Sequence, residues 1–177
     1  MGFMNGIEMK NNLLKIAFTG PECSGKTTLS LWLAAQLQWT YLPEFARAYL
    51  EGKAGYTHAD LEFIAKKQLE LSHGKEKCIS DTELLVIHIW EEEKFGIASP
   101  HIGACVEADH HDLYFLCRPD FEWEDDPLRE NPHDRERLFG IYLKKLQALN
   151  KPFVILEGDL TQRKNALQSY LGLNELT

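Results

Sequence analysis

A glycine-rich segment between an apolar run and a helical pattern constrains the fold more than any other feature of this chain. Residues 20–27 read GPECSGKT and fit the pattern G-x-x-x-x-G-K-[ST]. The apolar run LLKIAFT at residues 13–19 ends just before the segment, and Leu29, Leu33 and Leu37 follow it at helical spacing. This order of strand, glycine-rich loop and helix predicts a phosphate-binding loop, in which backbone N–H groups at the start of a helix surround phosphate oxygens.

The chemistry of such a loop assigns roles to its side chains. Lys26 is predicted to reach the outer phosphates of a nucleotide, and the hydroxyl of Thr27 to ligate Mg²⁺. The glycines allow the backbone angles that turn consecutive N–H groups toward one point. The predicted ATP-binding residues are Gly20, Glu22, Cys23, Ser24, Gly25, Lys26, Thr27 and Thr28.

Apolar runs alternate with helical patterns along the rest of the chain, which predicts an α/β fold with a parallel five-stranded sheet. The predicted strands are residues 13–19, 39–42, 77–80, 112–117 and 153–156, and the predicted helices are 26–37, 57–72, 82–94, 134–149 and 161–171. Thr57 and Asp60 form a capping box at the start of the second helix. Residues 118–133 contain three prolines and little periodicity, so we expect a loop there.

Composition limits the partners that the protein can have. The 177 residues suit one domain, with its core at residues 13–171, and 19 Lys and Arg against 27 Asp and Glu give a net charge of −8. An acidic chain without a basic cluster is a poor ligand for nucleic acid or for an anionic membrane. No apolar run approaches a membrane span, residues 1–10 lack the basic start and apolar stretch of a signal peptide, and the four cysteines are scattered. We therefore expect a cytoplasmic protein with reduced thiols.

Two acidic residues are candidates to hold the metal ion beside the phosphate-binding loop. Asp81 ends one predicted strand and Glu157 follows another. Chain order favours Asp81, because two later strands then complete the sheet. Asp81 would hold Mg²⁺ directly or through water, although an acid at the start of a helix is also favourable to the helix dipole.

A second carboxylate, Glu44, follows the second predicted strand. It is placed either to accept a proton from an attacking hydroxyl or to bind two sugar hydroxyls. A simple ion pair with Arg47 at i, i+3 is the alternative.

The loop at about residues 118–137 has the composition of a lid over a charged ligand. Trp123 lies among five acids at positions 120–126, which favours stacking on a flat cation over packing in a core. Arg129 and Arg135 are candidates to neutralise the transferring phosphoryl group, and the lid would exclude water. Trp90, on the helix after Asp81, is an alternative ring-binding residue. A solvated loop with Trp123 as its apolar plug is the other reading.

Five segments together resemble one family, and the similarity covers about residues 13–171. They are GPECSGKTTL at 20–29, PEFARAYLE at 43–51, SDTELL at 80–85, IWEEEKFG at 89–96 and WEDDPLRENPHDRERLF at 123–139. These segments resemble the ribosylnicotinamide kinase domain of NadR-type proteins, a member of the P-loop nucleoside and nucleotide kinases. The resemblance implies a three-layer α/β/α sandwich, Mg·ATP as phosphoryl donor and nicotinamide riboside as acceptor, with nicotinamide mononucleotide and ADP as products.

The resemblance also implies which residues act. It matches Lys26, Thr27, Glu44, Asp81, Trp123, Asp125 and Arg129 to positions of the family's site. With the residues singled out from the sequence itself, the expected catalytic residues are Lys26, Glu44, Asp81, Arg129 and Arg135, the expected substrate-binding residues are Glu44, Arg47, Tyr49, Trp90, Trp123 and Asp125, and the expected metal residues are Thr27 and Asp81.

This chain also departs from the family pattern. Only residues 1–12 precede the first predicted strand, so we expect neither the adenylyltransferase nor the DNA-binding activity of longer NadR proteins. Asp126-Pro127 replaces the Asp-Gly that is frequent in the family's lid, and Glu83 replaces the second acid of a D-T-D block. Another small nucleoside or nucleotide kinase, or a regulatory module that binds nucleotide without catalysis, remains an alternative.

Overall fold

The computed structural model describes residues 14–126 and 128–173. Its five strands all run parallel in the order β2-β3-β1-β4-β5. The strands are β1 (Lys15–Thr19), β2 (Thr40–Leu42), β3 (Cys78–Ser80), β4 (Leu113–Cys117) and β5 (Phe153–Leu156). The helices are α1 (Lys26–Leu37), α2 (Phe45–Leu50), α3 (His58–Ser72), α4 (Leu84–Phe95), α5 (Pro100–Ala108), α6 (Arg135–Ala148) and α7 (Leu160–Leu171). The predicted α/β fold with a parallel five-stranded sheet is confirmed.

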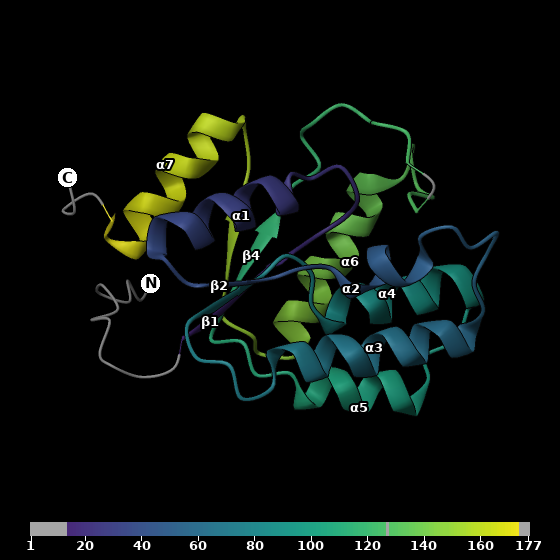
Figure 1. Cartoon of the computed structure of the whole chain (residues 1–177). Helices are drawn as coiled ribbons and strands as arrows, with labels where there is room; N and C mark the ends of the chain where they lie inside the picture. The colour runs from purple at the N-terminus through teal and green to yellow at the C-terminus, as the bar shows by residue number, and fades with distance from the viewer. Residues whose placement is uncertain (1–13, 127, 174–177) are drawn as a thin grey trace.

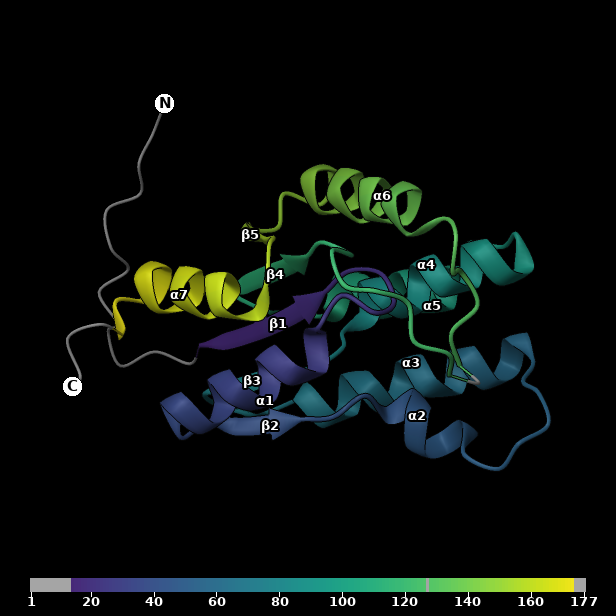
Figure 2. The same cartoon turned by 90° about the horizontal axis from the view of Figure 1, so that it is seen from above.

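Helices cover both faces of the sheet and produce three layers (Figures 1 and 2). Ile16 and Phe18 of β1 point to the face covered by α1 and α7, where Leu29 and Leu167 complete the core. Ala17, between them, points to the opposite face, which is covered by α4 and α6. Because successive side chains of a strand alternate between faces, a strand buried on both sides carries apolar residues at consecutive positions, as residues 16–18 of β1 and all of β4 do.

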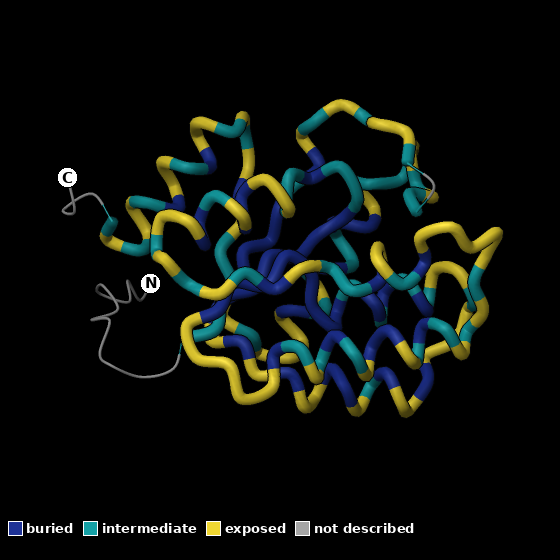
Figure 3. Tube along the Cα trace, viewed as in Figure 1, coloured by how far each residue is buried: buried dark blue, intermediate teal, exposed yellow. Residues whose placement is uncertain are grey.

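A third cluster of buried side chains joins α2, α3, α4 and α5 beside the sheet. Figure 3 shows the central strands as buried and the outer turns of these helices as alternately exposed. Helices α2 and α5 are absent from the predicted elements. The start of α5 has recognisable signals, since the Ser99 side chain accepts a hydrogen bond from the Ile102 N–H and Pro100 occupies the first turn.

The remaining predicted elements match the structure with shifts of one or two residues at their ends. The first strand begins at Lys15, and residue 13 lies outside the described residues. The helix predicted from residue 82 begins at Leu84, because Glu83 is its N-cap. The capping box of Thr57 and Asp60 is present, and residues 118–134 are without helix or strand where they are described. Within the described ranges, no helix is long and apolar enough to cross a membrane.

Candidate functional site

The predicted phosphate-binding loop connects the end of β1 to the start of α1. Two of its glycines have positive φ, 127° at Gly20 and 79° at Gly25. A Cβ atom at Gly20 would lie 2.5 Å from the carbonyl oxygen of Cys117, and one at Gly25 would lie 2.7 Å from the ring of Phe121. Backbone conformation and space both require glycine at these two positions.

Lys26 folds back over this loop. Its ammonium group donates hydrogen bonds to the carbonyl oxygens of Gly20 and Pro21, each at 2.8 Å. The ammonium is therefore held within the curve of the loop, at the positive N-terminal end of α1, where phosphate oxygens bind in such loops.

One cavity of about 780 Å³ extends from the loop across the carboxyl ends of the strands toward α4 and the 118–134 segment. Such a volume suits a nucleotide and a small acceptor together. All the predicted ATP-binding residues line it, and so do Glu44, Arg47, Trp90 and Arg129. Asp81, Arg135, Tyr49, Trp123 and Asp125 lie outside its lining.

Asp81 follows β3, which pairs with β1, so it lies at the same edge of the sheet as the phosphate-binding loop. The residue is 3 % exposed, and its Oδ2 atom accepts a hydrogen bond of 3.0 Å from the hydroxyl of Tyr41. Its other oxygen, Oδ1, is buried with no hydrogen-bond partner among the described residues. A buried carboxylate oxygen without a donor fits a cation, and an oxygen ligand is the type that Mg²⁺ prefers.

Glu157, the competing acid, is differently placed. Its side chain is 65 % exposed and forms an ion pair of 3.4 Å with Arg118. This contact fastens the turn after β5 to the segment after β4, and Glu157 does not line the cavity.

Glu44 has an electrostatic environment that suits a proton acceptor. It is the N-cap residue of α2 and lines the cavity. Burial raises the pKa of its carboxyl above the ordinary value, and Asp81 and Asp126 raise it further, while Lys26 and Arg47 lower it. Arg47 lies 3.8 Å from Glu44 and donates to Asp126 at 2.8 Å. A carboxylate with a raised pKa is a stronger base than an ordinary one.

Trp90 forms part of the far wall of the cavity. Its ring contacts that of Tyr56 edge-on, with 4.9 Å between centroids, and its indole N–H donates to the Tyr56 hydroxyl at 2.7 Å. Tyr56 donates in turn to Glu130, which also accepts from Lys94. The ring of Trp90 is thus held in a fixed orientation by a chain of hydrogen bonds.

The other predicted ring-binding residues contact protein groups. The indole N–H of Trp123 donates to Asp125 at 2.8 Å, and the Arg135 guanidinium lies 5.8 Å from the Trp123 ring centroid. Tyr49 donates to Asp60, and its ring packs beside Phe45.

The 118–134 segment lies directly against the phosphate-binding loop. The carboxylate of Glu22 accepts hydrogen bonds from the backbone N–H groups of Glu130 and Asn131, at 2.8 and 3.0 Å. Arg135 reaches the carbonyl oxygens of Cys23 and Phe121. Arg129 donates to the carbonyl oxygen of Glu124, within the same segment, and also lines the cavity. Glu22 therefore binds this segment, which we call the lid, in addition to being part of the phosphate-binding loop.

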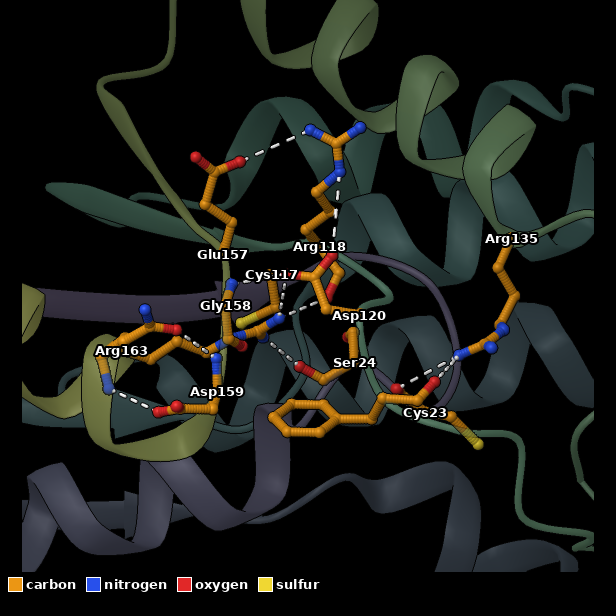
Figure 4. Close-up of polar contacts among 12 residues, drawn as sticks. Cys23, Ser24, Cys117, Arg118, Asp120, Arg135, Glu157, Gly158, Asp159 and Arg163 are labelled. Carbon is orange, nitrogen blue, oxygen red and sulfur yellow. Dashed lines mark hydrogen bonds and ion pairs between the residues drawn. The ribbon is translucent and has the colours of Figure 1, made fainter.

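Three residues of this region were absent from the sequence predictions. Tyr41 binds Asp81. Arg163 of α7 is fully buried and bonds to four groups around the phosphate-binding loop (Figure 4). Thr19 donates at 2.7 Å to Glu83, whose role the sequence left open and whose other oxygen caps α4 through the Leu85 N–H. Burial raises the pKa of Glu83 to about 7.

Comparison with solved structures supports the fold assignment. A NadR protein in complex with NR matches with a TM-score of 0.72 and 22 % identity over 90 % of this chain and 52 % of that chain. A NadR protein in complex with NAD and AMP-PNP matches with a TM-score of 0.69 and 18 % identity, over 90 % of this chain and 50 % of that one. The present chain thus spans about half the length of these NadR chains.

A deoxyadenosine kinase from M. mycoides with bound dATP matches with a TM-score of 0.61 and 17 % identity, over 90 % of this chain and 99 % of that chain. At these identities the comparisons establish a shared fold, and the resemblance to NadR is confirmed at that level.

A family model covers most of the chain. The model described as "AAA domain" matches residues 15–163, from the first residue of β1 to the buried arginine of α7. This range includes the phosphate-binding loop, Asp81 and the whole 118–134 segment. The chain therefore belongs to the AAA domain family.

Proposed function

We propose that this protein is a nucleoside kinase that transfers the γ-phosphoryl group of Mg·ATP to the 5′-hydroxyl of nicotinamide riboside. The products are nicotinamide mononucleotide and ADP. The observation that carries the proposal is one continuous cavity with a phosphate-binding loop at one end and Trp90 among carboxylates at the other. Fold similarity to the NadR structures supports the same acceptor.

The acceptor end has the chemistry for a flat cation. Glu93 of α4 lines the cavity with Trp90, and so does Glu130, which is joined to Trp90 through Tyr56. The nicotinamide ring of the riboside is positively charged, and attraction to the face of a tryptophan is worth on the order of 0.5–2 kcal/mol. Lys94 pairs with Glu130 and Arg137 pairs with Glu93, so these two carboxylates are held in place.

Two groups between the ends of the cavity would act on the reacting atoms. Glu44 accepts the proton of the 5′-hydroxyl, and its raised pKa suits that role. Lys26 turns from the loop carbonyls to the phosphate oxygens and offsets their charge. The lid, fastened by Glu22, limits the access of water to the phosphoryl group.

Thr27 and Asp81 would hold Mg²⁺, which offsets the negative charge of the phosphates when it is bound. The partnerless Oδ1 atom of Asp81 is the feature that fits such an ion. Arg129, which lines the cavity, supplies a further positive charge at the lid.

The test is acceptor-dependent release of ADP with nicotinamide riboside, thymidine, deoxycytidine and deoxyadenosine. We expect turnover to be greatest with nicotinamide riboside. Turnover with a neutral nucleoside and none with nicotinamide riboside would contradict the proposal and favour a deoxynucleoside kinase, a reading that the full-length match to deoxyadenosine kinase supports. Nucleotide binding without any acceptor-dependent ADP release would indicate a regulatory module.

Trp90→Leu and Trp123→Leu form a matched pair in this assay. Because Trp90 lines the cavity and Trp123 contacts Asp125 and Arg135, we expect only the first variant to raise the KM for nicotinamide riboside, by about tenfold. If only Trp123→Leu raised this KM, the nicotinamide ring would be assigned to Trp123.

A further inference from the structure

Arg163 is a fully buried cation beside the phosphate-binding loop (Figure 4). It projects from the first turn of α7, which begins after β5. Its NH1 group donates to the carbonyl oxygen of Ser24 at 2.7 Å, and its Nε group donates to that of Gly158 at 2.8 Å. Its NH2 group donates to the carbonyl oxygen of Arg118 at 2.8 Å and to Asp120 at 3.0 Å. One guanidinium thus connects three segments that are distant in sequence.

The bond to Ser24 bears on how the loop can hold phosphate. In a trans peptide the C=O and N–H bonds point in opposite directions, and no described peptide bond is cis. Arg163 draws the Ser24 carbonyl outward, away from the cavity, which Arg163 does not line. The N–H of Gly25 must then point the opposite way, toward the interior of the loop. Arg163 therefore sets the direction of one of the donors on which phosphate binding depends.

The same side chain holds the first residues of the 118–134 segment, residues 118–120, which we call the lid root. Arg118 and Asp120 accept hydrogen bonds from Arg163, and Asp120 also accepts one from the Gly158 N–H at 2.6 Å. The ring of Phe121 lies under the Arg163 guanidinium, with 4.6 Å between them, and also against Gly25. Displacement of the guanidinium would release the lid root and the loop together.

We propose that Arg163 is a positioning residue for nucleotide binding, which holds the Ser24–Gly25 peptide and the lid root in the orientation that phosphate requires. This inference rests on the proposed function for its link to catalysis. It requires only nucleotide binding for its test.

The experiment compares Arg163→Met and Arg163→Lys with wild type and with Lys164→Met. Lys164 is the next residue of α7 and lies over the ring of Trp32, so its variant removes a cation from the same turn without touching the loop. Dissociation constants are measured for MgADP and, separately, for nicotinamide riboside. Loss of a buried charged hydrogen bond corresponds to about a tenfold change or more in affinity.

We expect Arg163→Met to weaken MgADP binding at least tenfold, to raise the KM for ATP, and to change the affinity for nicotinamide riboside less than threefold. Arg163→Lys keeps the charge but not the planar set of donors, so it should also weaken MgADP binding. If Arg163→Met does not fold, Arg163→Lys provides the test in its place. Lys164→Met should match wild type.

A folded Arg163 variant that binds MgADP within twofold of wild type would overturn the proposal. An equal loss of affinity for MgADP and for nicotinamide riboside would also overturn it, because that pattern reports general damage to the fold. Wild-type protein that binds MgADP and phosphorylates no nucleoside would refute the proposed reaction and leave the MgADP comparison valid.

Discussion

Replacement of Arg47 by methionine should move the acid limb of the pH–rate profile to higher pH. Glu44 accepts a proton only when it is ionised, so kcat/KM falls as the pH drops through its pKa. Arg47 lowers that pKa from a distance of 3.8 Å. Its side chain is 53 % exposed, so the dielectric constant of water applies and the attraction is about 1 kcal/mol. This energy equals about 0.8 of a pH unit.

The sign of the shift follows from the contact between Arg47 and Glu44. Removal of the Arg47 charge takes away an attraction that favours the ionised Glu44. Asp126 raises the pKa of Glu44 in wild type and variant alike, so its repulsion does not contribute to the difference between them. The acid limb therefore moves upward, by about 0.8 of a unit at low ionic strength, and the shift shrinks at high salt because screening is nearly complete near 1 M.

The assay is kcat/KM for nicotinamide riboside between pH 4 and 9 at two salt concentrations. Lys53→Met is the matched control, because Lys53 is also an exposed cation and pairs with Asp60 at 3.0 Å, outside the cavity lining. It should leave the limb unchanged. In Glu44→Gln the limb should disappear and kcat should fall by about 10²–10⁴-fold.

The reasoning fails if Glu44→Gln keeps the acid limb at its wild-type position, since another group then accepts the proton. A limb that moves to lower pH in Arg47→Met would contradict the electrostatic assignment. An increase in the acceptor KM with unchanged kcat in Glu44→Gln would assign Glu44 to sugar binding, the other role that its position allows.

Two further substitutions test buried carboxylates. Asp81→Asn should raise the Mg²⁺ concentration needed for half-maximal activity by about 10–100-fold, which a Mg²⁺ titration measures; an unchanged titration would remove Asp81 from the metal site. The pKa of Glu83 is about 7 when folded and about 4.5 when unfolded, so the unfolded chain loses this proton first and the free energy of unfolding falls as pH rises between these values. Glu83→Gln should remove this loss, of at most about 3 kcal/mol, and urea unfolding at pH 5 and pH 8 checks it; an identical pH dependence in both proteins would contradict the assignment.

The sequence was most informative where the determinants are local. The phosphate-binding loop was predictable because its glycines, lysine and threonine are adjacent in the chain and lie between a strand and a helix. Strands β1 and β4 were predictable for a similar reason, since burial on both faces leaves a continuous apolar run. The capping box at Thr57 marked the start of α3 correctly.

Contacts between segments that are distant in sequence could not be predicted from local sequence patterns. Arg163 lies 139 residues from Ser24 in sequence, and nothing in its neighbourhood distinguishes it from an exposed arginine on a helix. Tyr41 binds Asp81 only because β2 and β3 are neighbours in the sheet. Helix α5 carried a local signal at Ser99 and Pro100, but its nine residues are too few for a clear helical period.

The two tryptophans show how composition and position can point to different residues. Trp123 was predicted to stack on a flat cation because acids surround it in sequence. In the structure, one of those acids accepts a hydrogen bond from its indole N–H, and Arg135 lies against its ring. Trp90 has an apolar helical neighbourhood, which is typical of a core residue, yet it lines the cavity. The acids that could favour a cation beside Trp90 come from α4 and from the lid, so their gathering depends on the docking of the lid on Glu22. The position of Glu130 beside Trp90 therefore depends on the contact of Glu22 with residues 130 and 131, which is separate from the contacts of Arg163 with Arg118 and Asp120.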